Sequence, residues 1–252
     1  MKFDIVTIFP RMVEALLLEG LIARAVEKKL LDVVVHDLRN FTTDRHRSVD
    51  DAPYGGGPGM VMKPEPFIRA VQQLRRHRGS PDAVILTSPQ GTLLTHKEAV
   101  RLSGLEHVVL LCGRYEGVDE RVYEEVATEE LSIGDYVVTG GELPAMVIVD
   151  AVGRHLPGVV GDTASVESDS FVRSLLDWPH YTRPAKLGSH KVPEVLLSGN
   201  HLEIQRWRKR AALRRTLQRR PELLGGAQGM DDEEREVLQE LQRDEEMRKA
   251  GA

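Results

Sequence analysis

Apolar runs with the length of buried strands alternate with helical patterns over much of the chain. The strand-like runs cover residues 3–9, 31–37, 83–87, 107–112 and 131–138. Between and after them, apolar residues recur at helical spacing over residues 11–29, 64–76, 96–103, 118–128 and 142–155. Repeated units of this kind predict an α/β fold with a mostly parallel sheet covered by helices on both faces. Such sheets bind ligands at the carboxyl ends of their strands, so the loops after the strands are where we expect chemistry.

The alternation stops near residue 156. Residues 161–168 are small and polar without a sustained period, and we interpret them as a flexible linker. Helical patterns return over residues 169–176 and 200–218, and the segment after Asp231 is an acidic amphipathic helix. The sequence therefore predicts an α/β domain over residues 1–160 and a helical C-terminal domain over residues 169–252.

Composition indicates an ordinary globular protein. The chain has 252 residues, of which 41% are hydrophobic, enough for a real core. No signal peptide is indicated, and the apolar runs are much shorter than the roughly 20 residues that cross a bilayer. With Cys112 as the single cysteine, no internal disulfide can form, which favours a cytoplasmic location. A buried small hydrophobe is the favoured interpretation of Cys112, and a catalytic thiol is the alternative.

Charge is segregated along the chain. A net charge of −5 argues by itself against binding to nucleic acid. Residues 201–220, however, hold eight basic side chains and one acid, whereas residues 231–249 hold nine acids and four bases. A solvated surface explains most charge runs, but an excess of one sign lacks the ion pairs that such a helix normally forms. The basic helix is therefore predicted to contact the phosphates of a polyanion.

Three segments of the chain are rich in glycine, and the second directly follows a predicted strand. They are Tyr54–Met60, Cys112–Gly117 and Ile133–Pro144. None has the spacing of a P-loop or of a dinucleotide-binding motif. Plain turns are one interpretation, especially for the first segment. The Arg, Tyr and Glu side chains among the glycines favour the other, in which the loops leave room for a flat ring such as adenine and read its edge with backbone groups.

Other candidate residues are isolated. Arg154, Asp169 and Asp177 stand near the predicted linker, where a solvated charge or a helix N-cap is the ordinary interpretation. His180 and Arg183 flank Tyr181, and a structural histidine is the default there. The nine histidines include no pair at zinc-ligand spacing, so no metal site is predicted.

Taken together, the motifs resemble those of the bacterial tRNA (guanine-N1)-methyltransferases, which belong to the knotted SPOUT superfamily. The resemblance rests on the joint order of YGGGPGM (residues 54–60), GRYEG (113–117), SIGDYV (132–137), TGGELPA (139–145), PHYTRP (179–184) and RRPEL (219–223). It implies a deep trefoil knot, a tRNA-binding C-terminal domain, and a homodimer whose active site lies at the subunit interface. It also implies S-adenosylmethionine as methyl donor, a possible need for magnesium, and no membrane association.

The resemblance assigns roles to individual residues. The implied reaction methylates N1 of the guanosine immediately 3′ of the anticodon, at position 37, with Asp169 as general base and Arg154 holding guanine O6. The implied cofactor residues are Leu86, Ser88, Pro89, Gly113, Tyr115, Glu116, Ile133, Gly134, Asp135, Tyr136, Val137, Val138, Gly140 and Gly141. The predicted RNA contacts are Tyr54, Gly59, Arg183, Arg208, Lys209, Arg210, Arg214 and Arg215. Two alternatives stay open: a related knotted enzyme acting on a ribose 2′-hydroxyl, and a non-enzymatic RNA-binding protein.

Overall fold

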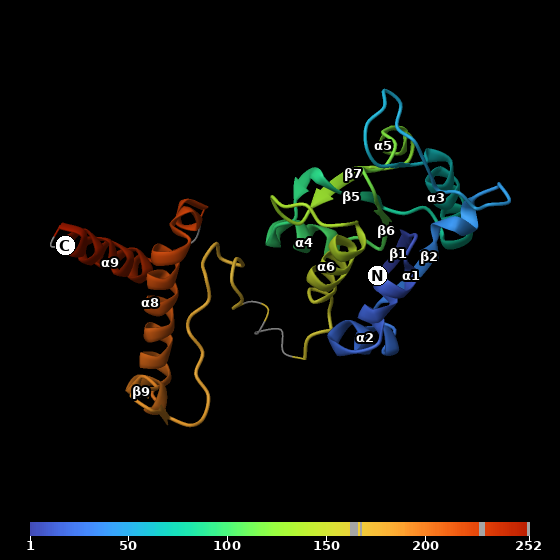
Figure 1. Ribbon diagram of the computed structural model, residues 1–252. Helices are drawn as coiled ribbons and strands as arrows, with labels where there is room; N and C mark the ends of the chain where they lie inside the picture. The colour runs from blue at the N-terminus through green and yellow to red at the C-terminus, as the bar shows by residue number, and fades with distance from the viewer. Residues whose placement is uncertain (162–165, 167, 227–229, 251–252) are drawn as a thin grey trace. The chain divides into compact units, whose positions relative to one another are not determined.

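The computed structural model describes residues 1–161, 166, 168–226 and 230–250 (Figure 1). The chain divides into two compact units, unit 1 over residues 1–163 and unit 2 over residues 164–252. Most of the predicted linker, residues 162–165 and 167, lies outside the described residues.

Unit 1 is built on a parallel sheet of five strands in the order β2-β1-β6-β5-β7. The strands are β1 (Lys2–Thr7), β2 (Asp32–Asp37), β5 (Ala83–Leu93), β6 (His107–Cys112) and β7 (Glu129–Ser132). Every residue of β6, at the centre of the sheet, is buried, as expected for a parallel strand covered on both faces. A separate two-stranded antiparallel ladder joins β3 (Asp50–Asp51) and β4 (Val61–Met62). The predicted α/β fold with a parallel sheet is confirmed.

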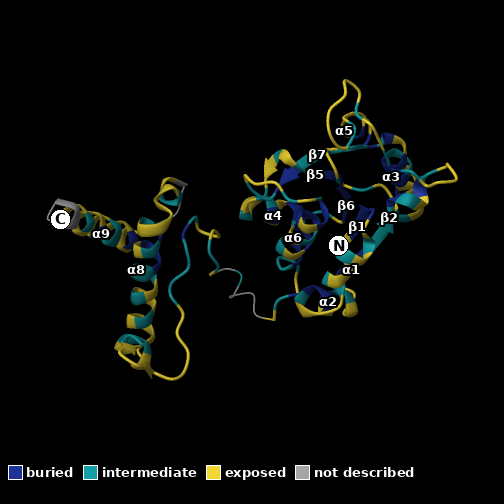
Figure 2. Ribbon diagram, in the orientation of Figure 1, coloured by how far each residue is buried: buried dark blue, intermediate teal, exposed yellow. Residues whose placement is uncertain are grey.

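Helices cover both faces of the sheet, which separates two apolar cores (Figure 2). Alternate residues of β1 point to opposite faces, so Phe3 and Ile5 belong to one core and Val6 to the other. The first core is closed by α1 (Pro10–Glu14), η1 (Ala15–Leu17), α2 (Gly20–Glu27), α4 (His96–Ser103) and α6 (Glu142–Gly153). The second is closed by η2 (Leu38–Phe41), α3 (Pro64–Arg78) and α5 (Arg121–Glu125).

Three predicted elements of unit 1 differ most from the structure, and the helix predicted over residues 118–128 is shorter, as α5 (Arg121–Glu125). The single helix predicted over residues 11–29 is divided, because Gly20 has a φ of 87° and starts a new helix. The strand predicted over residues 131–138 ends at Ser132, where the chain turns into a loop through Gly134, whose φ is 146°. The strand predicted to end at Thr87 instead continues to Leu93 past an irregularity in its pairing with β7.

Unit 2 is mainly helical. It contains β8 (Lys186–Leu187), β9 (His190–Lys191), η3 (Glu194–Leu197), α8 (His201–Arg219), η4 (Pro221–Gly226) and α9 (Asp232–Ala250). Its small core joins Leu175, Leu213 and Leu241. The helix predicted over residues 169–176 is wrong: this segment forms turns, since Phe171 and Ser174 have positive φ values of 78° and 55°. Among the described helices, none is both long and apolar enough to cross a membrane.

Candidate functional site

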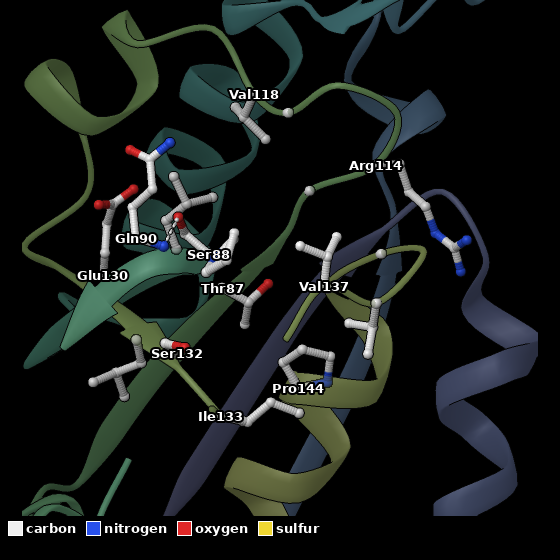
Figure 3. Close-up of a pocket in the computed structure, with 18 of the residues that line it drawn as sticks. Thr87, Ser88, Gln90, Arg114, Val118, Glu130, Ser132, Ile133, Val137 and Pro144 are labelled. Carbon is white, nitrogen blue, oxygen red and sulfur yellow. Dashed lines mark hydrogen bonds between the residues drawn. The ribbon is translucent and has the colours of Figure 1, made fainter. Parts of the chain in front are cut away.

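A cavity opens at the carboxyl ends of β5 and β6, where the fold rule for parallel sheets places ligands (Figure 3). Three chain segments form its wall: one lies within β5 at the irregularity in its pairing with β7, one follows β6, and one includes the end of β7. They are residues 86–90, residues 113–120 with Tyr123, and residues 130–141 with Pro144, all of which line the cavity except Asp135. Two of the three glycine-rich segments therefore meet around one space.

Backbone contacts hold these two glycine-rich loops together. Gly141 N donates to Gly113 O at 2.8 Å, and Arg114 pairs with Gly140 as an isolated antiparallel bridge. A Cβ atom added at Gly141 would lie 2.8 Å from Cys112 Cα and 2.9 Å from Gly113 N, closer than real side chains come. Because those neighbours are backbone atoms of a buried strand end, they cannot move aside cheaply. Glycine at this position is a requirement of the loop geometry.

A buried ion pair lies behind the loops. The Glu142 carboxylate, fully buried at the start of α6, accepts from Arg114 Nε at 2.8 Å and from the Thr7 hydroxyl at 2.6 Å. Arg114 also donates to Thr139 O at 3.1 Å and lies over the Phe9 ring. In Figure 3 its side chain points away from the cavity, toward α1. Arg114 therefore anchors the loop 139–141 and does not face a ligand in the cavity.

The thiol of Cys112 lies buried next to this pair. Cys112 is fully buried, and burial together with the nearby Glu142 charge raises the pKa of its thiol well above the ordinary value. A thiol in this state supplies little thiolate. The structure thus supports the small buried hydrophobe and disfavours the catalytic alternative.

The first glycine-rich segment packs against Glu116, which lines the cavity. Gly59 has a φ of 82°, a conformation that residues with side chains rarely adopt, and a Cβ there would overlap the Glu116 side chain. Two backbone bonds fix the approach: Glu116 N donates to Met60 O at 3.0 Å, and Met62 N donates to Gly117 O at 2.9 Å. By contrast, Tyr54 at the other end of the segment is completely exposed.

Carboxylates dominate the charge around the cavity. Glu116, Glu120 and Glu130 line it, as does Asp119, whose charge is compensated by Arg121 at 2.6 Å. Burial and the neighbouring charge of Glu120 raise the pKa of Glu130 above its ordinary value, against a hydrogen bond from Ser88 that lowers it. Carboxylates that repel one another favour a cationic ligand, which would relieve the repulsion.

Comparison with known proteins decides the family. The family model described as tRNA (guanine-1)-methyltransferase TrmD matches residues 1–226. A protein of Geobacter metallireducens named tRNA (guanine-N(1)-)-methyltransferase is 54% identical over 243 residues, 96% of this chain and 98% of the relative. Proteins of the same name from Pelotomaculum thermopropionicum and Fervidobacterium nodosum are 52% and 55% identical, over 96% and 88% of this chain and 96% and 89% of their own lengths. The chain belongs to the tRNA (guanine-N1)-methyltransferase family.

The structure brings together nearly all the residues predicted to hold the cofactor of this family. Thirteen of the fourteen line the cavity, and Asp135 is the exception. Sequence reasoning missed several lining residues, because nothing local marks them: Thr87, Gln90, Val118, Glu120, Tyr123 and Glu130. Ser132, Thr139 and Pro144 also line the cavity and belong to the quoted motifs, but no role was assigned to them. Arg114 was identified in the sequence only as part of the GRYEG motif.

The two predicted catalytic residues lie in different units. Arg154 follows the last residue of α6 in unit 1 and is half-buried. Asp169 belongs to unit 2 and is also half-buried, with its backbone N–H bonded to Val166 O at 3.4 Å. Their roles stay predictions.

The basic helix of this family member differs from expectation in one respect. The sequence predicts that its charge lacks partners, but α9 and the residue before it supply them along one side. Lys209 Nζ lies 2.6 Å from Asp231 and 3.2 Å from Glu233, and Arg210 lies 2.7 Å from Glu240. The acidic segment therefore packs against the basic one, a pairing that the separate charge counts do not reveal.

Proposed function

We propose that this protein transfers a methyl group from S-adenosylmethionine to N1 of the guanosine immediately 3′ of the anticodon, position 37, in tRNA. The observation that carries the proposal is the cavity of glycine-rich loops at the carboxyl ends of β5 and β6, in a chain of the tRNA (guanine-N1)-methyltransferase family. Family membership favours this reaction over the ribose methyltransferase and over the non-enzymatic RNA-binding protein.

The residues around the cavity fit the methyl donor. S-adenosylmethionine would supply a methyl group activated by a positively charged sulfur. The uncompensated carboxylates of Glu116, Glu120 and Glu130 suit a ligand with positive charge. Gly140 and Gly141 let their loop pack closely against Arg114 and the end of β6, and residues 133, 134 and 136–138 line the cavity, where their backbone groups can read the edge of an adenine ring.

Methylation of guanine N1 requires a proton acceptor. N1 of guanine carries a proton and is a poor nucleophile until that proton leaves. We assign the acceptor role to Asp169. Negative charge then develops on O6, and the Arg154 guanidinium holds it with fixed donors. The target base must leave its stack, which costs less in a single-stranded anticodon loop.

A homodimer is part of this proposal, with Asp169 of one subunit acting beside the cavity of the other. In its support, α6 exposes Leu143 and Val147, which are 42% and 44% accessible and lie four residues apart on one helical face. Leu18 at the end of η1 is 76% accessible. Exposed apolar residues on a core helix are typical of a subunit interface.

Two finer expectations rest on the family resemblance alone. The trefoil knot would lie in unit 1, and it is a strong claim because knots are nearly absent from proteins in general. Magnesium dependence is the other, and both stay predictions.

The first test is chemical. The purified protein is titrated with S-adenosylmethionine in a calorimeter and then incubated with an unmodified tRNA transcript. The transcript is digested to nucleosides, which are identified by mass spectrometry. We expect cofactor binding and 1-methylguanosine, which should be absent when the transcript carries adenosine at position 37. A nucleoside methylated on its ribose would refute methylation of the guanine base. A protein that binds no S-adenosylmethionine would refute the assignment as a methyltransferase.

A second test addresses Asp169 as the general base. Asp169→Asn should lower turnover about 100-fold or more, since a positioned general base contributes that much, while leaving cofactor affinity intact. Asp244→Asn, on the exposed surface of α9, is the matched control and should keep full turnover. Turnover retained by Asp169→Asn would remove Asp169 from the mechanism.

A further inference from the structure

The positive charge of unit 2 is not equally available on all sides of α8. Lys209 and Arg210 are engaged by Glu233 and Glu240 of α9 and by Asp231, which directly precedes it, and Arg206 lies 3.4 Å from Glu233. Ion pairs with α9 therefore compensate this side of the helix, which we call the α9 side. A phosphate that binds there must displace a carboxylate first.

Another side of α8 contacts the segment that precedes it. Arg208 lies over the Trp178 ring at 4.9 Å, and Arg215 donates to Asp177 O at 3.3 Å. Trp207 lies 6.3 Å from Tyr181, measured between ring centroids. We call this side, together with residues 178–191, the hairpin side. Among the described residues, no carboxylate is paired with Arg208 or Arg215.

The hairpin carries positive charge that the fold does not compensate. Between Asp177 and Glu194 the sequence has no acid, and it has Arg183, Lys186 and Lys191. Residues 181–191 are all exposed. Lys186 and Lys191 are direct cross-strand partners in the β8–β9 ladder, an arrangement in which like charges destabilise the pair. Among the described residues, no carboxylate is paired with either lysine, so a cost of this kind would be relieved when a polyanion binds.

Aromatic rings accompany this charge. Tyr181 is 50% accessible and lies beside the half-buried Trp207, next to Arg208. Aromatic faces beside cations are the combination that binds single-stranded RNA, with bases stacked on the rings and phosphates held by the cations. The α9 side lacks this combination of free charge and exposed ring.

We propose that tRNA contacts unit 2 through the hairpin side, with Lys186, Lys191 and Arg208 on its phosphates, and that the α9 side is a structural contact between helices. The inference rests on the proposed function for its substrate and assigns the surface that receives it. It also divides the predicted RNA contacts: Arg208 and Arg183 keep that role, whereas Lys209 and Arg210 hold α9.

Two double variants test this division, since each removes two positive charges. Lys186→Ala with Lys191→Ala alters the hairpin side, and Lys209→Ala with Arg210→Ala alters the α9 side. The affinity for an unmodified tRNA transcript is measured at a series of salt concentrations. Circular dichroism and the unfolding midpoint establish that each variant is folded.

We expect the hairpin variant to bind tRNA at least 10-fold more weakly at low salt and to lose about 1.5 from the slope of log affinity against log salt, because two phosphate contacts disappear. The α9-side variant should keep the wild-type slope. An unchanged slope in the hairpin variant, or an equal loss in both variants, would overturn the inference.

A separate readout keeps this test apart from the proposed function. The wild-type protein is assayed for 1-methylguanosine with the same transcript. If none forms while the two variants still differ in slope, the proposed reaction fails and the surface stands. If 1-methylguanosine forms and the slopes contradict the division, the surface fails and the reaction stands.

Discussion

Two networks of charged residues in this protein differ in their exposure to solvent. In unit 1, the Asp4 carboxylate is completely buried and is bonded to His36 Nε2 at 2.6 Å, His107 Nε2 at 2.7 Å and Arg78 Nε at 2.8 Å. In unit 2, the pairs between α8 and α9 have side chains that are between 35% and 65% accessible. The comparison separates charges that fix a fold from charges that shape a surface.

The physical difference is desolvation. A buried carboxylate that loses its partners keeps the cost of its burial, so removing one member of such a network is strongly destabilising. Exposed pairs gain little over hydration, and salt screens them. We therefore expect the buried network to control stability and the exposed one to control the charge that an approaching polyanion meets.

The largest effect is expected at Asp4. Asp4→Asn should lower the free energy of unfolding by about 3–5 kcal/mol, because His36, His107 and Arg78 all lose an anionic acceptor in the core. Urea unfolding measures this loss. Asp32→Asn is the matched control, since Asp32 bonds the same Arg78 at 2.8 Å but is 52% accessible, and it should cost less than about 1 kcal/mol. Equal losses in the two variants would contradict the distinction.

Asp4 should also make the stability of the fold depend on pH. Burial raises the pKa of Asp4, but the hydrogen bonds from His36, Arg78 and His107 outweigh burial and hold that pKa below its ordinary value. A carboxyl whose pKa is lowered in the folded state adds stability above its unfolded pKa and loses it as the pH falls through the folded value. The Asp4 contribution should therefore be complete above about pH 4 and decline below it. Asp4→Asn should flatten the stability curve in that acidic range, and a curve of unchanged shape would exclude Asp4 as its source.

An intermediate effect is expected behind the cavity. Glu142→Gln keeps the size of the side chain but removes the charge that Arg114 faces, which should cost about 2 kcal/mol of unfolding free energy. Because Arg114 also anchors Thr139, the cavity loop loosens and affinity for S-adenosylmethionine should fall about 10-fold. Calorimetric titration and urea unfolding measure the two effects. Glu98→Gln, which breaks the surface pair with Arg101, is the control and should leave cofactor affinity unchanged.

The sequence predicts the buried sheet of unit 1 better than its charged networks. An uninterrupted apolar run such as Val108–Cys112 identifies a central strand, because a strand covered on both faces needs apolar residues throughout. No local pattern indicates that Asp4 meets Arg78 or that Arg114 meets Glu142, since these contacts join residues far apart in the chain. Glycine clusters located two cavity loops, but the close approach of Gly59 to Glu116 depends on tertiary structure.

Unit 2 was harder to predict for two further reasons. The positive φ values of Phe171 and Ser174 end the expected helix over residues 169–176, and neither residue type signals a left-handed conformation. The charges of α8 and α9 were counted correctly as opposite blocks, but counting does not show which side of α8 receives the acids. That information decides which cations are available to RNA.

The smallest effect is expected at Glu240, the partner of Arg210. Glu240→Gln frees one cation on the α9 side, so at low salt the affinity for tRNA should rise by no more than about threefold, and at high salt the gain should vanish because the added attraction acts through solvent. Asp232→Asn changes the net charge of α9 by the same amount but leaves the pairs with α8 intact, since Asp232 bonds Arg235 of its own helix. If α9 only adds negative charge, the two variants gain equally. If α9 acts by occupying Arg210, as the structure indicates, Glu240→Gln gains more. A gain of tenfold or greater would mean that the α9 side is itself a strong RNA site held closed by its own acids.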